Sequence, residues 1–153
     1  MSTEIVNQEQ QAEQAYKSIR GTLVKAQHTV YNAVNSAMVT AYWEIGEQIY
    51  HVCGENERAA YGQYILQYLS EHLTKEFGRG YTVRNLRFMR QFYLAFPIRN
   101  ALRTELSWTH YRSLMRVNDA KARAFYADGA VKDGWSSRQL ERQINTMYYQ
   151  PIL

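Results

Sequence analysis

Apolar residues recur at intervals of three and four along the first third of the chain, which is the spacing of one face of an α-helix. This row predicts one long amphipathic helix that ends at Gly54, and its length allows a break near Asn35-Ser36. Residues 1–14 are polar and acidic, and we expect them to form a flexible N-terminus. The apolar row consists of Tyr16, Ile19, Leu23, Ala26, Val30, Val34, Met38, Tyr42, Ile45, Ile49 and Val52.

A pair of shorter helices with a glycine turn between them is predicted over residues 61–96. The first runs from about Tyr61 to the turn Gly78-Arg79-Gly80, where glycine supplies backbone freedom. The second is capped by Thr82 and stops before Pro97. Tyr81 is expected to pack on Leu86, and the inner face of the first helix is predicted to carry Tyr61, Ile65, Tyr68, Leu69, Leu73 and Phe77.

Three more helix starts follow, each marked by a capping residue. Ser107 opens a short helix to about Val117, and Asp119 opens one that reaches Lys132 and is closed by Gly134. Ser136, with Gln139 three positions later, forms a capping box. Strand-like alternation is missing, so we predict an all-α fold: a long N-terminal helix, a helix-turn-helix and a C-terminal three-helix segment, in one domain over residues 15–147.

Charge is unevenly distributed along the chain, whose net charge is +4. Residues 79–116 hold eight arginines and a single acid, Glu105, whereas residues 1–78 are acidic. Arginine's planar guanidinium suits phosphate groups and guanine edges, so a polyanion is the expected partner of this block. The single cysteine, Cys53, excludes an internal disulfide. A polar start and no long apolar run predict a cytoplasmic protein without a membrane span.

The helix that begins at Thr82 separates two kinds of side chain on a helical wheel. Leu86, Met89 and Phe92 gather on one side, and Arg84, Arg87 and Gln91 gather on the other. Basic and amide side chains in the first turns of the second helix are typical of helix-turn-helix proteins, which read base edges in the major groove. The predicted DNA-binding residues are Arg79, Thr82, Arg84, Asn85, Arg87, Phe88, Arg90 and Gln91. A merely solvated helix face is the alternative.

Six blocks of the sequence carry a resemblance to a known family. They are Ala41-Tyr42-Trp43-Glu44-Ile45-Gly46, Tyr61-Gly62, Glu76-Phe77-Gly78-Arg79-Gly80-Tyr81, Asn85-Leu86-Arg87-Phe88-Met89-Arg90-Gln91-Phe92-Tyr93, Leu106-Ser107-Trp108-Thr109-His110-Tyr111-Arg112 and Gly134-Trp135-Ser136-Ser137-Arg138-Gln139-Leu140-Glu141. In this order the blocks resemble the N-terminal domain of the YhcG-type proteins. In that family the helical domain precedes a PD-(D/E)XK nuclease domain, so the resemblance implies a DNA-engaging module that delivers a nuclease.

The nuclease half implied by this resemblance has no counterpart in the sequence. Its fold needs an acid followed, on adjoining strands, by Glu-x-Lys to hold a divalent metal, and no such strand pair is predicted. Residues 148–153 are therefore expected to lead toward an absent nuclease domain. A more distant likeness is to the helix-turn-helix domain of ParB-like proteins, carried by Leu106, Ser107, His110, Ser136, Arg138, Leu140 and Glu141.

Other reactive side chains do not form a predicted site. Glu44, Glu47 and His51 share one helix face but lack ligands from a second helix. Cys53 near His51 lacks a third catalytic group, and His110 is expected to make a packing or backbone contact. We therefore predict no catalytic residue, no metal site and no cofactor in this chain. Two alternatives to a DNA-binding module stay open: a protein-interaction or homodimer scaffold built on the long N-terminal helix, and an enzyme acting alone.

Overall fold

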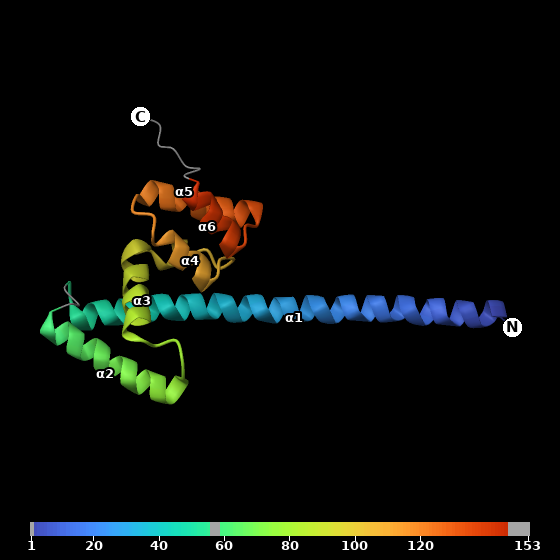
Figure 1. The fold of residues 1–153 in the computed structure, drawn as a ribbon, viewed down its shortest axis with the longest axis horizontal. Coiled ribbons are helices and arrows are strands. Elements are labelled where there is room, and N and C mark those ends of the chain that lie inside the picture. The colour runs from blue at the N-terminus through green and yellow to red at the C-terminus, as the bar shows by residue number, and fades with distance from the viewer. Residues whose placement is uncertain (1, 56–58, 147–153) are drawn as a thin grey trace. The chain divides into compact units, whose positions relative to one another are not determined.

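The structure is a computed structural model that describes residues 2–55 and 59–146. These residues form helices and connecting turns, without a strand, as the sequence predicted (Figure 1). None of their helices is long and apolar enough to cross a membrane. The predicted tail, 148–153, lies outside the described residues. The elements are α1 (Ser2–Cys53), α2 (Ala60–Phe77), α3 (Val83–Ala95), the short 3-10 helix η1 (Arg99–Ala101), α4 (Trp108–Leu114), α5 (Ala120–Asp133) and α6 (Ser137–Asn145).

The first helix is longer than its apolar row predicted. It begins at Ser2, so residues 2–14, expected as a flexible N-terminus, are helical. Neither glycine nor proline precedes Gly21, and Lys17 pairs with Glu13 one turn earlier, 3.6 Å away. Both features favour helix. The expected break near Asn35-Ser36 is not present, because hydrogen-bonded helix continues through these residues.

The chain nevertheless divides into two compact units close to that point. One unit ends at Val34 and the other begins at Asn35. We predicted one domain over residues 15–147, but the side chains that pack into a core belong to the second unit. The first unit consists of helix whose described side chains are exposed.

Helix caps are the part of the fold that follows most directly from the sequence. Thr82, Ser107, Asp119 and Ser136 each cap the helix predicted for them. The Ser136 hydroxyl accepts from the Gln139 backbone N–H at 3.1 Å, and the Gln139 side chain accepts from the Ser136 N–H at 2.8 Å. This is the predicted capping box.

His110 forms a second capping box that the sequence did not predict. Its Nδ1 accepts from the Ser107 backbone N–H at 3.1 Å, and its Nε2 lies 2.8 Å from the carbonyl oxygen of Trp135. Because a carbonyl only accepts, Nε2 carries the proton and donates. The ring therefore joins the start of α4 to the turn before α6, which is the backbone contact expected for this histidine.

The buried faces of α1 and α2 differ from the predicted ones. In α1 the buried residues of the second unit are Val39, Trp43, Gly46 and Ile49, whereas Val52 is 50% exposed. In α2 the buried positions are Gly62 and Leu66. Tyr61, Tyr68 and Phe77, predicted to face inward, are exposed. The predicted faces included these three aromatic rings and no glycine, although Gly46 and Gly62 are buried.

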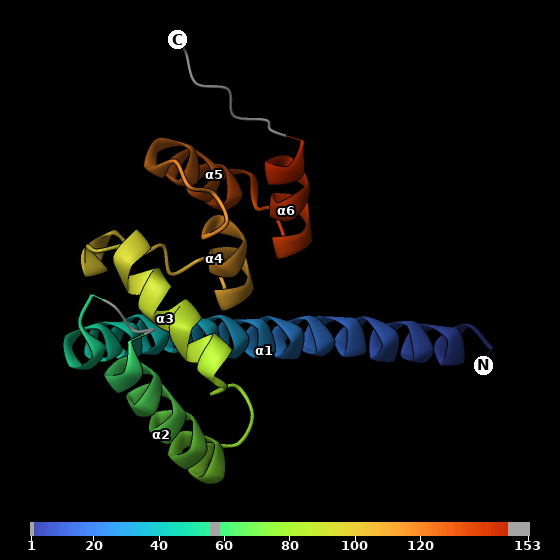
Figure 2. The same ribbon diagram turned by 60° about the vertical axis from the view of Figure 1, so that its left-hand side comes forward.

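Two apolar clusters hold together the helices of the second unit, whose ribbon Figure 2 shows from a second side. The larger one joins α1 to α3, α4, α5 and α6 and has Phe92, Tyr111 and Leu140 at its centre. The Tyr111 hydroxyl accepts from the Arg103 N–H at 2.7 Å and donates to the Arg103 carbonyl at 2.9 Å. Burial raises the pKa of Tyr111 to about 12, so the hydroxyl keeps the proton that it donates. The smaller cluster is Ile49, Leu66, Leu86 and Met89.

The backbones of α1 and α3 touch at Gly46. A Cβ atom at this position would overlap the Met89 carbonyl oxygen and would lie 2.6 Å from the Met89 carbonyl carbon. Both obstacles are helix backbone, which cannot rotate away as a side chain could. The indole N–H of Trp43 donates to the Phe96 carbonyl at 2.7 Å, which ties the same two helices together at the C-terminal end of α3.

We expect Gly46→Ala to lower the free energy of unfolding by about 1–3 kcal/mol, because the added methyl group forces two packed backbones apart. Gly21→Ala is the matched control: it lies in the same helix with nothing within 4 Å of the new atom. That change should stabilise the helix by about 0.5–1 kcal/mol. Urea unfolding followed by circular dichroism measures both, and equal stability of the two variants would contradict the backbone contact.

Candidate nucleic-acid interface

The turn between α2 and α3 is built from two glycines with positive φ. Gly78 has φ 83° and Gly80 has φ 112°, values that residues with a side chain rarely adopt. The Thr82 hydroxyl accepts from the Asn85 backbone N–H at 3.1 Å, and the Asn85 side chain donates to the Gly80 carbonyl at 3.3 Å. Thr82 and Asn85, two of the predicted DNA-binding residues, therefore hold the turn and the start of α3.

The exposed face of α3 carries the residues that the helical wheel grouped together. Arg84 and Gln91 are exposed, and Arg87 and Phe88 are half-buried. These four line a hollow of about 260 Å³. On the opposite side of the helix, Leu86, Met89 and Phe92 are fully buried. The predicted separation of core-facing and exposed residues is thus confirmed for α3.

Arg112 of α4 joins this face, and the sequence interpretation missed it. Its guanidinium carbon lies 4.8 Å from the centre of the Phe88 ring, and that of Arg84 lies 5.6 Å from the same ring. Two cations thus share one aromatic ring. The signal was present in the sequence, because Arg112 belongs to the same arginine-rich block, but nothing local placed α4 beside α3.

Arg90, also a predicted DNA-binding residue, lies in the interior instead. It is 7% exposed, and its terminal nitrogen donates to the carbonyls of Gly54 and Glu55 at 2.8 and 2.9 Å. The guanidinium also lies 5.4 Å from the centre of the Tyr50 ring. Arg90 therefore binds the C-terminal end of α1, where a cation is favourable to the last carbonyls of a helix. Arg90 is therefore not part of the candidate interface.

Three other arginines of the block are paired with acids from elsewhere in the chain. Arg99 contacts Glu44 and Arg103 contacts Asp128, both at 2.6 Å, and Arg116 contacts Glu141 at 3.3 Å. All three acids lie outside residues 79–116. The block contains few acids, but in the folded chain these three arginines still have acidic partners.

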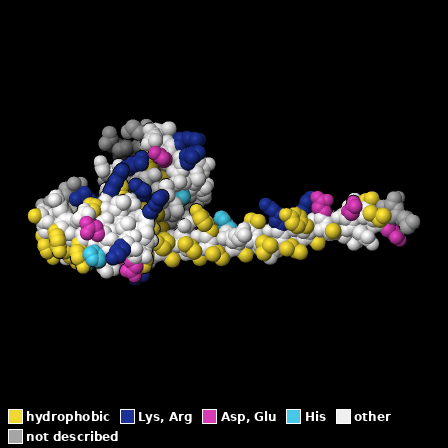
Figure 3. Space-filling model, turned by 60° about the horizontal axis from the view of Figure 1, so that its bottom comes forward, with side chains coloured by type: hydrophobic (Ala, Val, Ile, Leu, Met, Phe, Trp, Pro, Cys, Tyr) yellow, Lys and Arg dark blue, Asp and Glu magenta, His cyan; other side chains and the backbone are white. Residues whose placement is uncertain are grey.

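Four arginines of the block have no acidic partner among residues 2–55 and 59–146: Arg79, Arg84, Arg87 and Arg112. The Nε of Arg87 is buried and has no hydrogen-bond partner in that part of the chain. A buried donor without an acceptor is costly, and the Nε atoms of Arg90 and Arg123 are in the same situation. Figure 3 shows several Lys and Arg side chains close to one another over the second unit.

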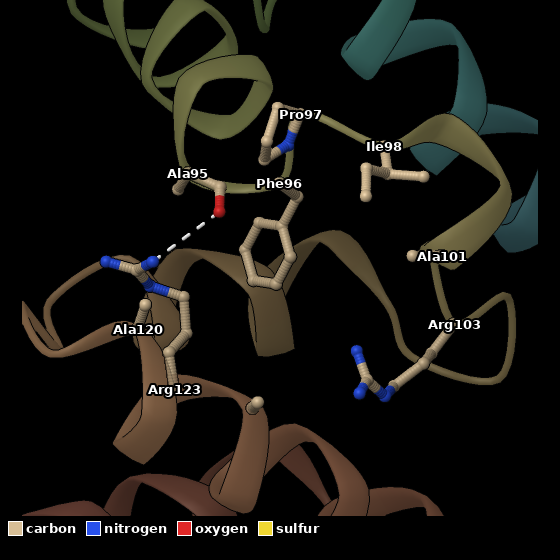
Figure 4. Close-up of a pocket in the computed structure, with 9 residues that line it drawn as sticks. Ala95, Phe96, Pro97, Ile98, Ala101, Arg103, Ala120 and Arg123 are labelled. Carbon is tan, nitrogen blue, oxygen red and sulfur yellow. Dashed lines mark hydrogen bonds between the residues drawn. The ribbon is translucent and has the colours of Figure 1, made fainter.

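A second hollow, of about 230 Å³, lies between the end of α3 and α5 (Figure 4). Its walls include Phe96, Pro97 and several alanines. Arg123 at its edge donates to the Val117 carbonyl at 2.8 Å and to the Ala95 carbonyl at 3.5 Å. Arg103 is already paired with Asp128. The cations of this hollow are committed to the fold, so it is a weaker candidate for an anionic ligand.

Potential metal ligands are scattered over the described residues. They contain no cluster of three or more His, Cys, Asp or Glu side chains that could hold a metal ion. Glu44, weighed earlier as a metal ligand, is instead paired with Arg99. The arrangement on α3 and α4 is suited to binding an anion through guanidinium groups.

Comparison with known proteins matches the chain to one family. Residues 18–151 match the DUF1016 N-terminal domain. The chain is 32% identical over 174 aligned positions to the protein named "Putative nuclease YhcG" of Escherichia coli (strain K12). The alignment covers 92% of this chain but 46% of that relative, so the chain spans about half of the relative's length. No solved structure matches.

We expect Arg90→Gln to lower the free energy of unfolding by about 2–3 kcal/mol, because the carbonyls of Gly54 and Glu55 lose a charged donor. The control is Arg84→Gln, which removes the same charge from the exposed face of α3. Its loss should stay below about 1 kcal/mol. Chemical unfolding compares them, and a stable Arg90→Gln protein would return Arg90 to the candidate interface.

Proposed function

The chain belongs to the DUF1016 N-terminal domain family, and we propose that it is a DNA-binding module that directs a nuclease to its substrate. Arg84, Arg87, Phe88 and Gln91 of α3, with Arg112 of α4, form the proposed binding surface. The observation that carries the proposal is the cluster of arginines without acidic partners among the described residues, around a hollow large enough for an acceptor group. Of the other arginines of the block, Arg90 is buried, and Arg99, Arg103 and Arg116 are paired with acids.

The packing of α2 and α3 supports assigning them to a helix-turn-helix. The two helices pack together across the glycine turn, and Arg84 in the first turn of α3 is exposed. In such motifs the second helix enters the major groove, where arginine pairs with guanine and glutamine pairs with adenine. We therefore assign base contacts to Arg84, Arg87 and Gln91.

Backbone phosphates would be bound by the residues around that helix. Arg79 is exposed in the turn, at the N-terminal end of α3, where helix backbone N–H groups also favour an anion. Arg112 reaches the same face from α4 and is assigned to a phosphate as well. Thr82 and Asn85 act through the geometry of the turn. Contacts of this kind fix the position of a protein on DNA but carry no sequence information.

We assign DNA cleavage to a part of the nuclease outside the described residues. The E. coli relative carries the name of a nuclease and is about twice as long as the aligned region. The resemblance implies a PD-(D/E)XK domain there, with its own divalent metal. This chain would supply position and affinity, and no cofactor of its own.

Self-association is a second candidate function, favoured by a separate observation. Large apolar side chains along the first unit, such as Ile19, Leu23 and Val30, are more than half exposed. Monomeric proteins rarely leave a continuous apolar row in water. We infer that α1 also serves to assemble copies of the chain.

DNA binding should depend on the cluster and on salt. We expect the double variant Arg84→Ala/Arg87→Ala to raise the Kd for duplex DNA roughly 10- to 100-fold. The negative slope of log K against log salt should become less steep by about 1–2, because about two phosphate or base contacts are lost. Fluorescence anisotropy over a salt series measures both, on a panel of duplex, junction, end and single-stranded substrates.

The matched control is Arg99→Ala/Arg103→Ala, which removes two positive charges from arginines that are already paired with Glu44 and Asp128. Its Kd should change less than about 3-fold, since paired surface charges contribute little. Circular dichroism confirms that both variants stay helical. Equal losses in the two variants would show that affinity follows net charge, and an unchanged Arg84→Ala/Arg87→Ala protein would refute the assigned surface.

Incubation of the chain with duplex DNA and Mg²⁺ should leave the DNA intact. The expectation rests on the proposed division of labour between this module and a catalytic domain. Gel analysis of supercoiled plasmid detects a single nick, so it is the appropriate measurement. Cleavage that survives repeated purification would instead make this chain an enzyme.

A further inference from the structure

The first unit of the chain carries an apolar row on which no described residue packs. Between Thr3 and Val34 every residue is exposed. Ile5, Tyr16, Ile19, Leu23 and Val30 are each more than half exposed. Figure 3 shows hydrophobic side chains recurring along this part of α1. An isolated helix gains little from such residues, so they point to a partner.

The spacing of the row is that of a coiled coil. Ile5, Ala12, Ile19, Ala26 and Ala33 follow one another at intervals of seven. A second set, offset by three or four residues, lies on the same face: Glu9, Tyr16, Leu23 and Val30. Two such alternating sets make the a and d positions of a heptad repeat over roughly four heptads. The partner is therefore expected to be another amphipathic helix.

Charge within residues 2–34 changes sign near the middle of the segment. Glu4, Glu9 and Glu13 lie in the first half, and Lys17, Arg20 and Lys25 follow. No acid lies between Lys17 and Val34. A helical segment that is acidic at one end and basic at the other complements a copy of itself that runs in the opposite direction.

We propose that residues 2–34 pair with the same residues of a second copy as an antiparallel coiled coil, an inference that rests on the self-association of α1 proposed above and specifies its direction. The register that fits both patterns sets Tyr16 against Ile19 of the second copy. It then sets Leu23 against Ala12, and Val30 against Ile5. Each of these contacts occurs twice, because the pairing is symmetric. In this register Ile5, Tyr16, Ile19, Leu23 and Val30 each meet an apolar side chain of the other copy.

Charges decide between the two directions. Antiparallel pairing sets Glu13 beside Arg20 of the second copy, and Glu9 beside Ala26 and Lys25. Parallel pairing would instead set Glu9 against Glu9 at a core position, where two like charges would be taken out of water. It would also leave Arg20 beside Ala15, without an ion pair. The same sequence therefore favours one direction by both attraction and repulsion.

Sedimentation equilibrium of the full chain tests the self-association. The unaltered protein should be a dimer at micromolar concentration. Leu23→Asp, in the contact row, should raise the dimer Kd on the order of 100-fold, since both copies lose an apolar contact and gain a charge. Val24→Asp adds the same charge at the next residue, which is exposed but off the row. Its Kd should change only a few-fold.

Cysteine crosslinking tests the direction, in a Cys53→Ser background. Mixing Ala12→Cys with Leu23→Cys chains should give a disulfide-linked heterodimer on mild oxidation. Ala12→Cys alone should not crosslink, because antiparallel pairing separates the two copies of this residue. Efficient crosslinking of Ala12→Cys alone would show parallel pairing and overturn the proposal.

A monomeric unaltered chain would also overturn the proposal, as would equal effects of Leu23→Asp and Val24→Asp. The binding of duplex DNA by Leu23→Asp distinguishes the two proposals, because this variant should keep the salt slope of the unaltered chain. The proposed DNA surface lies on α3 and α4, so failure of the coiled coil leaves that surface standing. Loss of helix in Leu23→Asp is monitored by circular dichroism, and the crosslinking arm does not use that variant.

Discussion

The packing of the second unit depends on the contact between the backbones of α1 and α3 at Gly46. Helices normally approach until side chains meet, but here a residue without a side chain lets the Met89 carbonyl come against α1. The neighbouring side chains follow from that approach. Ile49 and Met89 enter one cluster, and Trp43 reaches the carbonyl at the end of α3. Once α3 is fixed in this way, its remaining face is the one that carries Arg84 and Gln91.

The sequence was sufficient to predict where helices begin and end, because the hydrogen bonds that cap a helix are local. Ser136 and Gln139 are three residues apart, and their two hydrogen bonds need no other part of the chain. The separation of Leu86 from Arg84 on α3 is likewise a property of one helix. By contrast, the inward faces of α1 and α2 depend on which neighbour approaches. Gly62 and Gly46 are buried and Tyr61 is exposed, and no periodicity of apolar residues expresses that.

The roles of the arginines needed the fold for the same reason. Arg84, Arg90 and Arg99 are equivalent when charge is counted along the chain. In space one is exposed, one is bound to the end of α1, and one is paired with Glu44. Each partner lies at least 35 residues away in the sequence. Arg112 entered the candidate site by the opposite route, through a contact with Phe88 that joins α4 to α3.

Both ends of α3 are tied down before any ligand arrives. The Phe96 carbonyl accepts from Trp43 at one end, and Thr82 with Asn85 closes the other. A helix held in this way has already lost its backbone conformational entropy during folding. Binding through its exposed face would then restrict side chains alone, at about 0.5–1.5 kcal/mol for each long side chain that becomes immobile. A surface of this kind is preorganised: more of its gross interaction energy is retained as affinity.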